Sequence, residues 1–198
     1  MKRFLKLWLC LVFAAAMQAT AQTDKPVMHS YAFDDGGILT GMSDNGLWAV
    51  ASATNSSNTL ILENPRLLGV DSGTELLLSE GYEEGKSLNC GANDVTNDGN
   101  VVVGRFGGLP AVWRRTGETS GAWTQLPVPD GYDGGMVNAV TPDGKYAVGV
   151  ATTSTNILLE KEVMWDLTTN AILATPGLPA KDAAHLDQGQ SRFTAISA

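Results

Sequence analysis

Short apolar segments alternate with polar turns along most of this chain, and one arrangement of them recurs. Each unit begins with a short apolar segment that leads to a Ser or Thr, continues through a turn containing Gly, and ends in β-branched or aromatic residues. Full copies lie at 42–51, 94–104 and 139–149, and a fourth copy begins at 193–198. Self-similarity of this kind indicates a repeat architecture.

The hydroxyl residues of the four copies set the length of the repeating unit. They are Ser43, Thr96, Thr141 and Ser197, at intervals of 53, 45 and 56 residues. The apolar runs are short and rich in β-branched residues, so they predict strands and not helices. Each full unit contains four such segments, and four antiparallel strands in about 45 residues is the size of one β-propeller blade.

We therefore predict an all-β fold, an incomplete β-propeller of about three four-stranded antiparallel blades plus the start of a fourth. The predicted boundaries are 37–87 for blade 1, 88–130 for blade 2, 131–178 for blade 3, and 179–198 for a linker and the start of blade 4. The third and fourth strands of blade 1 are expected at 59–62 and 74–78. A small sandwich-like domain is the alternative, and strand pairing confined within each unit would argue against it.

An Asn–Gly or Asp–Gly dipeptide in each copy predicts a tight turn between the first two strands. The turn residues are Asn45 and Gly46, Asp98 and Gly99, and Asp143 and Gly144. Such dipeptides supply the positive φ that a two-residue hairpin requires. Trp113 and Trp165 occupy equivalent places later in their units, and we interpret both as packing residues between blades.

The first 21 residues have the features of a signal peptide. Three basic residues precede an apolar run of 11 residues at 7–17, and Ala19 and Ala21 supply the small residues that a signal peptidase needs. The run is too short to span a bilayer of roughly 30 Å as a helix. We predict cleavage after Ala21, an N-terminal linker at 22–36 and no stable membrane insertion afterwards, with a retained signal anchor as the alternative.

The positions of the two cysteines favour neither a disulfide nor a nucleophilic thiol. Cys10 lies inside the apolar run after the bulky Leu9, which disfavours lipid attachment, and cleavage removes it. Cys90 then stands alone, and only His29 and His185 are present as histidine bases. We interpret Cys90 as a small buried hydrophobic residue at the start of an inner strand, with a catalytic thiol as the less favoured alternative.

The mature chain is acidic. Without the signal peptide it has 10 basic and 21 acidic residues, a formal charge of −11. Such a surface disfavours nucleic acid, which binds through Lys and Arg, and anionic membrane surfaces. The negative charge is explained by solubility outside the cytoplasm. As the partner of the protein we predict a protein or glycan ligand.

The motifs of metal, cofactor and catalytic sites are missing from the sequence. Residues 94–99 resemble the start of a calcium loop, but Arg105 occupies the twelfth position, where Glu is required. No Gly-x-Ser-x-Gly, phosphate-binding Gly loop or metal-ligand spacing is found. We predict no catalytic, cofactor or metal residue. Asp182, His185 and Asp187 mark one candidate functional loop, with a solvated spacer as the alternative.

The repeat Ala-Val/Ile-Thr/Ser-x-Asp-Gly-x-x-x-Val-Gly, followed by an apolar pair and Trp, resembles the extracellular HAF-type repeat. Residues 142–145, Pro-Asp-Gly-Lys, are similar to the strand pair of TolB-like propellers. The resemblance covers 37–198 and implies an exported repeat protein without an assigned activity. The leader ending in Ala-Gln is similar to those of exported Bacteroidetes proteins, which implies type IX secretion as a possible route.

The fourth copy reaches Ala198 at the place where the earlier copies continue with an Asp–Gly turn. We therefore expect an N-terminal fragment whose partners include its own missing C-terminal blades, because a propeller ring has four to eight blades. The function we predict is a non-enzymatic, exported scaffold for binding or surface interaction. The alternative is an extracellular glycan or peptide hydrolase whose site lies in the downstream blades.

Overall fold

The computed structural model describes residues 37–54, 62–78, 89–154, 160–175 and Ile196. The chain divides into two compact units, 1–30 and 31–198, and every described residue belongs to the second. In these residues no helix is long and apolar enough to cross a membrane. The predicted signal peptide, the linker 22–36 and the loop with Asp182, His185 and Asp187 lie outside the described residues.

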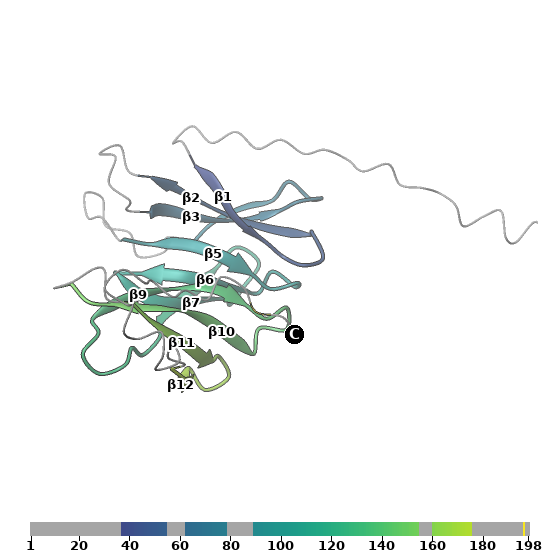
Figure 1. Cartoon of the computed structure of the whole chain (residues 1–198). Coiled ribbons are helices and arrows are strands. Elements are labelled where there is room, and N and C mark those ends of the chain that lie inside the picture. The colour runs from purple at the N-terminus through teal and green to yellow at the C-terminus, as the bar shows by residue number, and fades with distance from the viewer. Residues whose placement is uncertain (1–36, 55–61, 79–88, 155–159, 176–195, 197–198) are drawn as a thin grey trace, which may run out of the picture. The chain divides into compact units, whose positions relative to one another are not determined.

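Twelve strands form three sheets of four strands each in the described part of the chain (Figure 1). The first sheet contains β1 (Ile38–Met42), β2 (Trp48–Thr54), β3 (Leu62–Gly69) and β4 (Glu75–Leu77). The second contains β5 (Gly91–Val95), β6 (Val101–Phe106), β7 (Leu109–Arg115) and β8 (Gly121–Gln125). The third contains β9 (Gly134–Val140), β10 (Tyr146–Thr152), β11 (Glu160–Asp166) and β12 (Ala171–Ala174).

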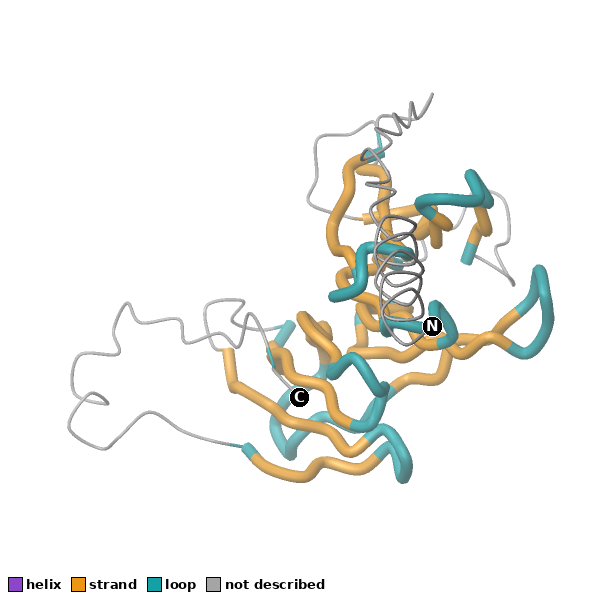
Figure 2. Tube along the Cα trace, turned by 90° about the vertical axis from the view of Figure 1, so that its right-hand side faces the viewer, coloured by secondary structure: helices purple, strands orange, loops and turns teal. Residues whose placement is uncertain are grey.

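In every sheet the strands follow one another in sequence order, and all neighbouring strands are antiparallel. We call the three sheets blades 1, 2 and 3. The prediction of an all-β fold with three four-stranded antiparallel blades is confirmed. Pairing stays within each unit, which argues against the sandwich. Figure 2 shows the strands of the three blades in orange and the turns between them in teal. Of the expected fourth blade only Ile196 is described.

The second strand of blade 2, β6, is apolar on both faces because another blade packs on either side of it. Val102 of β6 belongs to the core shared with blade 1, whereas its neighbour Val103 belongs to the core shared with blade 3. A strand covered on both faces loses the alternation of apolar and polar residues and becomes a continuous apolar run. This explains the run of β-branched residues that follows the turn of blade 2.

Two cores join the blades. Between blades 1 and 2 the buried residues are Val50, Leu67 and Leu78 with Ala92, Val95, Val102 and Trp113. Between blades 2 and 3 they are Val103, Val112 and Leu126 with Val137, Val140, Ala147, Ala151, Val163, Trp165 and Leu167. We call the side of a sheet that contacts the previous blade, as in blades 2 and 3, its preceding face. The opposite side, which contacts the next blade in blades 1 and 2, is its following face.

The third strand of blade 1 differs from its prediction. It runs over Leu62–Gly69, whereas the sequence placed it at 59–62, of which 59–61 lie outside the described residues. Proline has no N–H to donate to a ladder, which disfavours Pro65 within a regular strand. The register between β2 and β3 shifts between Ala51 and Ala53, opposite Pro65, so the missing donor interrupts no regular pair there.

The turns between first and second strands are longer than predicted. In blade 1 the N–H of Gly46 donates to the carbonyl of Ser43 (2.9 Å), and the N–H of Ser43 donates to the carbonyl of Trp48 (2.9 Å). The loop between Ser43 and Trp48 therefore has four residues. Only the glycine is left-handed, with φ of 71° at Gly46, 68° at Gly99 and 72° at Gly144. The prediction of a two-residue hairpin is therefore wrong, and the residue before the glycine is present for its side chain.

Candidate functional site

A side-chain hydrogen bond closes each of the three turns. Thr96 Oγ1 donates to Asp98 Oδ1 (2.6 Å) and accepts from the N–H of Val101 (3.1 Å). The same bond joins Ser43 to Asn45 (2.8 Å) and Thr141 to Asp143 (2.7 Å). The repeated hydroxyl and the repeated Asn or Asp therefore act together to fix the turn.

These bonds set the charge state of two aspartates. Burial alone would raise the pKa of Asp98, but hydrogen bonds from Thr96 and Asn100 outweigh it, so the pKa lies below its ordinary value. The pKa of Asp143 is lowered to about 2 by hydrogen bonds from Lys145 and Thr141. Both groups are ionised at neutral pH and serve as acceptors within their turns.

Polar side chains on the first strands tie each blade to the next. Thr40 Oγ1 donates to the carbonyl of Ala92 (2.5 Å), and Asn93 Nδ2 donates to the carbonyl of Val137 (2.7 Å). Thr40 and Asn93 both lie three residues before the repeated hydroxyl. The same contact is therefore made twice between successive blades.

Asp94 adds a second link between blades 2 and 3. Its Oδ2 accepts from the N–H of Val140 (2.9 Å) and its Oδ1 from the N–H of Val95 (2.9 Å). Burial raises the pKa of Asp94, these two N–H groups oppose the rise, and the charge of Asp44 adds to it. Because both oxygens already bind backbone donors, Asp94 is placed to hold strands together and not to abstract a proton.

The first strands of the three blades surround a cavity of about 280 Å³. It is lined by Thr40, Gly41, Met42, Asp44, Asn93, Asp94, Asn138, Ala139, Val140 and Ile196. Ile196 comes from the fourth copy of the repeat and lies at the position of Met42 and Val140. The described lining has two carboxylates and no Lys, Arg or His, so the cavity offers mainly acceptors and negative charge.

The two tryptophans of the repeat lie in the cores between blades. Trp113 is 1% exposed in the core between blades 1 and 2, and Trp165 is 0% exposed in the core between blades 2 and 3. The indole N–H of Trp165 donates to the carbonyl of Pro127 in blade 2 (2.8 Å). Strand pairing places Leu68 at the equivalent position of blade 1.

Cys90 is fully buried and not disulfide-bonded. Burial raises the pKa of its thiol to about 12, and the nearby charge of Arg105 opposes only part of this rise. The group is therefore a neutral thiol at physiological pH and a poor nucleophile. In the described part of the chain, no three His, Cys, Asp or Glu side chains come together as a metal site.

The sequence analysis missed the cavity residues Thr40, Asn93 and Asn138. A signal was available, because the position three residues before the hydroxyl is Thr or Asn in all four copies. A polar residue repeated inside an apolar segment marks a group that needs a partner. In two copies the structure shows this partner as a carbonyl of the next blade.

No family model and no curated protein matches this chain. A protein assigned as TolB from Agrobacterium tumefaciens is similar in structure, with a TM-score of 0.47, 18% identity, and coverage of 70% of this chain and 48% of that one. Kuenenia stuttgartiensis hydrazine synthase is similar with a TM-score of 0.43, 15% identity, and coverage of 68% and 35%. The chain thus spans about half and about a third of these two structures. The assignment of the three sheets as blades therefore depends on the sheet topology of this chain.

Proposed function

We propose that this chain is an exported repeat protein that serves as a scaffold for binding, with the cavity between its first strands as the binding site. The observation that supports this proposal is the set of polar side chains that three repeats direct to one cavity of about 280 Å³. Clefts with a few convergent polar groups are the usual ligand sites of proteins. The proposed ligand is a protein segment or a glycan.

The charge of the cavity narrows the ligand class. Asp44 and Asp94 both line it, and the desolvated carboxylate of Asp94 repels anions strongly because screening by water is weak there. A neutral or positively charged group fits this lining, for example the hydroxyl groups of a neutral glycan or the basic side chain of a protein. Uronic acids and phosphorylated ligands are disfavoured.

The export route belongs to the same proposal. The basic start, the short apolar run and Ala21 support cleavage by a signal peptidase, and the HAF-like repeat supports a periplasmic, surface or secreted location. The blade boundaries at 37–87, 88–130 and 131–178 follow from the repeat. N-terminal sequencing of the exported protein should give Gln22 as its first residue, and an intact leader would contradict cleavage.

The binding site can be tested with the mature chain, residues 22–198, on an array of neutral, basic and acidic glycans and peptides. Asp44 lines the cavity and is exposed, so Asp44→Ala should weaken binding about tenfold or more without unfolding the protein. Asp71→Ala, at an exposed turn of the same blade outside the cavity, is the matched control and should bind normally. Equal binding by both variants, or binding of acidic ligands alone, would contradict the proposed site.

A further inference from the structure

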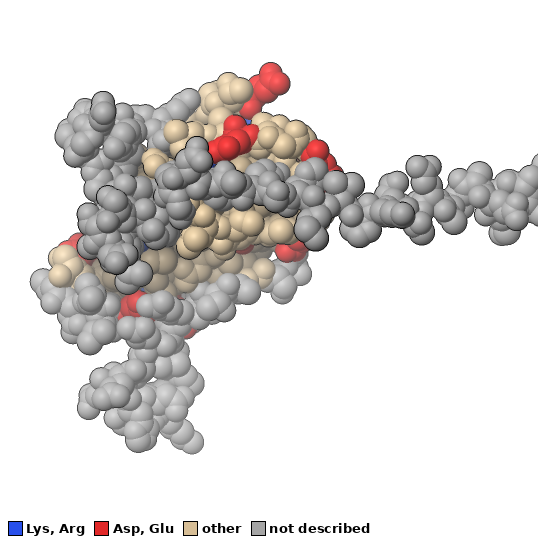
Figure 3. Space-filling view, turned by 90° about the horizontal axis from the view of Figure 1, so that it is seen from above, with Lys and Arg blue, Asp and Glu red and all other residues tan. Residues whose placement is uncertain are grey.

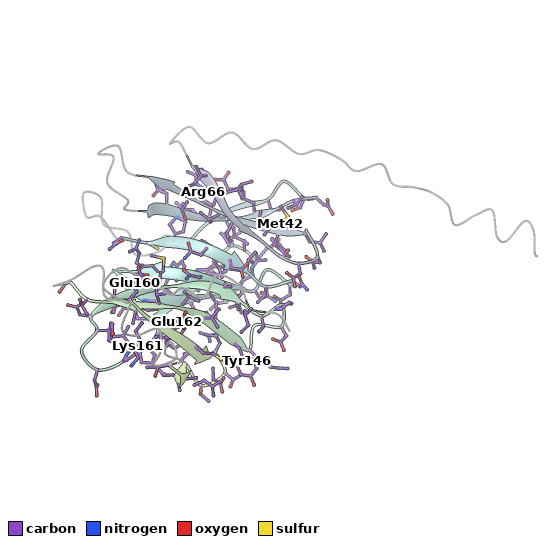
Figure 4. The ribbon with its side chains drawn as sticks, in the orientation of Figure 1. Met42, Arg66, Tyr146, Glu160, Lys161 and Glu162 are labelled. Atoms are coloured by element: carbon purple, nitrogen blue, oxygen red, sulfur yellow. The ribbon has the colours of Figure 1, made fainter. Side chains whose placement is uncertain are left out.

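Asparagine is followed by glycine once in the whole chain, at Asn45–Gly46 in the turn of blade 1. Met42, which Figure 4 labels, lies just before this turn. Asparagine deamidates most readily before glycine, because glycine has no side chain to keep its nitrogen away from the amide carbon. Asn45 is exposed, and no atom of the described residues lies within 4 Å of the place where Gly46 would carry a Cβ. Water therefore reaches the reacting groups.

Deamidation at this pair needs only water as a second reactant. The backbone nitrogen of Gly46 attacks Cγ of Asn45, the bond from Cγ to Nδ2 breaks, and the displaced amino group leaves as ammonia with the proton of the Gly46 nitrogen. Water then opens the cyclic succinimide at either of its carbonyls. One opening gives aspartate, and the other gives isoaspartate, in which the main chain runs through the side chain.

The closed turn opposes the first step, because both reacting groups are already engaged. The N–H of Gly46 donates to the carbonyl of Ser43 (2.9 Å), which fixes the nucleophile. Asn45 Oδ1 accepts from Ser43 Oγ (2.8 Å) and from the N–H of Leu47 (3.1 Å). Asn45 Nδ2 donates to the carbonyl of Asn97 (2.8 Å). Attack on Cγ therefore requires a local opening that breaks these bonds.

An aspartate in this turn would lack a partner that the other two turns provide. In blade 2 the second carboxylate oxygen, Asp98 Oδ2, accepts from Asn100 Nδ2 (2.9 Å). In blade 3 Asp143 Oδ2 forms an ion pair with Lys145 Nζ (2.9 Å). Asn100 and Lys145 both come four residues after the repeated hydroxyl. The residue at that position in blade 1 is Leu47, which has no donor in its side chain.

Asn45 instead uses a partner in the turn of blade 2. Its Nδ2 donates to the carbonyl of Asn97 (2.8 Å), and its N–H donates to Asn97 Oδ1 (3.0 Å). An aspartate at position 45 has no donor to replace Nδ2, so it would turn a carboxylate oxygen toward a carbonyl oxygen. Deamidation thus removes one of these two links between the turns of blades 1 and 2.

We propose that Asn45 is a site of spontaneous deamidation that the closed turn holds back, and that the aspartate product weakens the turn because blade 1 lacks the donor found in blades 2 and 3. Chemical ageing of the protein then begins where the turns of blades 1 and 2 meet. This modification site goes beyond the proposed binding function and does not depend on it.

Peptide mass spectrometry of the protein, kept at mildly alkaline pH, measures the reaction. In concentrated guanidinium chloride the change from amide to acid should appear first at Asn45, and in native buffer it should be about tenfold or more slower there, because only the open turn reacts. Gly46→Ala should slow the reaction in denaturant, where the fold has no influence. Earlier deamidation of another asparagine in denaturant, no effect of Gly46→Ala there, or equal rates at Asn45 in both solutions, would overturn the proposal.

Two variants distinguish opening of this turn from unfolding of the whole chain. Ser43→Ala removes the hydroxyl that holds Asn45 and should speed the native reaction about threefold or more. Thr141→Ala removes the equivalent bond to Asp143 in blade 3 and should leave the rate at Asn45 unchanged. Equal acceleration by both variants would overturn control by the turn. If circular dichroism shows that Ser43→Ala is unfolded, Asn97→Ala takes its place, because it removes the acceptor of the Asn45 N–H.

The effect of the product is measured with Asn45→Asp in freshly prepared protein. This change should lower Tm by about 2–4 °C, because a hydrogen bond is lost and the second oxygen has no donor. Adding Leu47→Asn supplies the donor that blade 2 has in Asn100 and should restore about half of the loss. Leu47→Asn alone is the matched control and should leave Tm nearly unchanged. An unchanged Tm in Asn45→Asp, or no recovery in the double variant, would overturn the proposed effect of the product.

Discussion

Asp98 and Asp143 lie at the same place in successive turns, where the first copy has Asn45. All three side chains accept a hydrogen bond from the hydroxyl two residues earlier and from the backbone N–H two residues later. The asparagine shows that the turn needs an acceptor oxygen and not a charge. The two aspartates differ from it in one respect, since their acceptors can be protonated.

Acid should therefore destabilise the turns of blades 2 and 3 more than the turn of blade 1. The pKa values of Asp98 and Asp143 are lowered in the folded chain, so their contribution to stability is present above the unfolded pKa near 4 and is lost as pH falls toward about 2. The double variant Asp98→Asn with Asp143→Asn should lose less unfolding free energy between pH 4 and pH 2 than the original chain, as measured by urea denaturation at each pH.

A matched pair of changes controls for the loss of two carboxylates. Asp71 and Asp130 are exposed aspartates in other turns, and replacing both by Asn should leave the pH dependence close to that of the original chain. The raised pKa of Asp94 acts in the opposite direction, but it is common to all three proteins and cancels in the comparison. Equal pH dependence in all three proteins would show that the turn aspartates contribute nothing.

At the scale of elements, the turn of one blade packs against the second strand of the blade before it. The indole ring of Trp48, at the start of β2, lies against Gly99, where an added Cβ would come within 2.4 Å of two ring carbons. The guanidinium of Arg115 lies over the same ring, 4.9 Å from its centroid. The glycine of this turn is thus needed for its left-handed φ and also for its small size.

Substitutions at Gly46 and Gly99 distinguish the effect of the left-handed φ from the effect of side-chain size. Both are left-handed, but a Cβ at Gly46 would meet nothing within 4 Å. Gly46→Ala should cost about 1 kcal/mol for the backbone alone. Gly99→Ala should cost about 3 kcal/mol, because the methyl group also displaces Trp48. Urea denaturation of both variants measures the difference, and equal costs would mean that Trp48 moves away freely.

The repeat predicted most of the strands because their signals are local. The runs that became β6 and β10 are β-branched and follow a glycine turn, so they were recognised without knowledge of the neighbouring blades. The third strand of blade 1 was misplaced because Pro65 belongs to an irregular pairing that depends on β2. The residue of blade 1 that corresponds to Trp113 was missed as well, because it is Leu68 and not a tryptophan.

The cavity could not be predicted from one repeat. The roles of Thr40 and Asn93 depend on which carbonyl of the next blade lies opposite, and this is decided by how two sheets pack. A sequence gives the period of the repeat but not the rotation between successive units. The expectations for Asp182, His185 and Asp187 stay predictions, because these residues lie outside the described part.

At the scale of the whole molecule, the described blades differ in how much of each is covered by another described blade. Blade 2 packs against blade 1 on one face and blade 3 on the other, whereas blade 1 has the exposed Leu39, Met42 and Leu77 on its preceding face. Figure 3, the view from above, shows a few acidic side chains in red and little blue among the described residues. In repeat proteins the stability of each unit depends on its neighbours.

The rate of amide hydrogen exchange should be lowest in the blade that is covered on both faces. The amides of β6 and β7 should exchange most slowly, because both faces of blade 2 are covered and local opening there breaks two cores. The amides of β1 and β4, the two edge strands of blade 1, should exchange faster. Uniform protection across the blades would contradict this order.

The hydrogen bonds from Thr40 to Ala92 and from Asn93 to Val137 have a consequence for growth of the array. A blade of this kind carries both halves of the connection, the donor for its successor and the acceptor for its predecessor. In an additional copy of 88–130, spliced in tandem after the original, Asn93 of the first copy could donate to the carbonyl of Ala92 in the second, so the new junction would keep this link. Gene duplication can therefore lengthen such a protein one blade at a time while keeping this polar link at every junction.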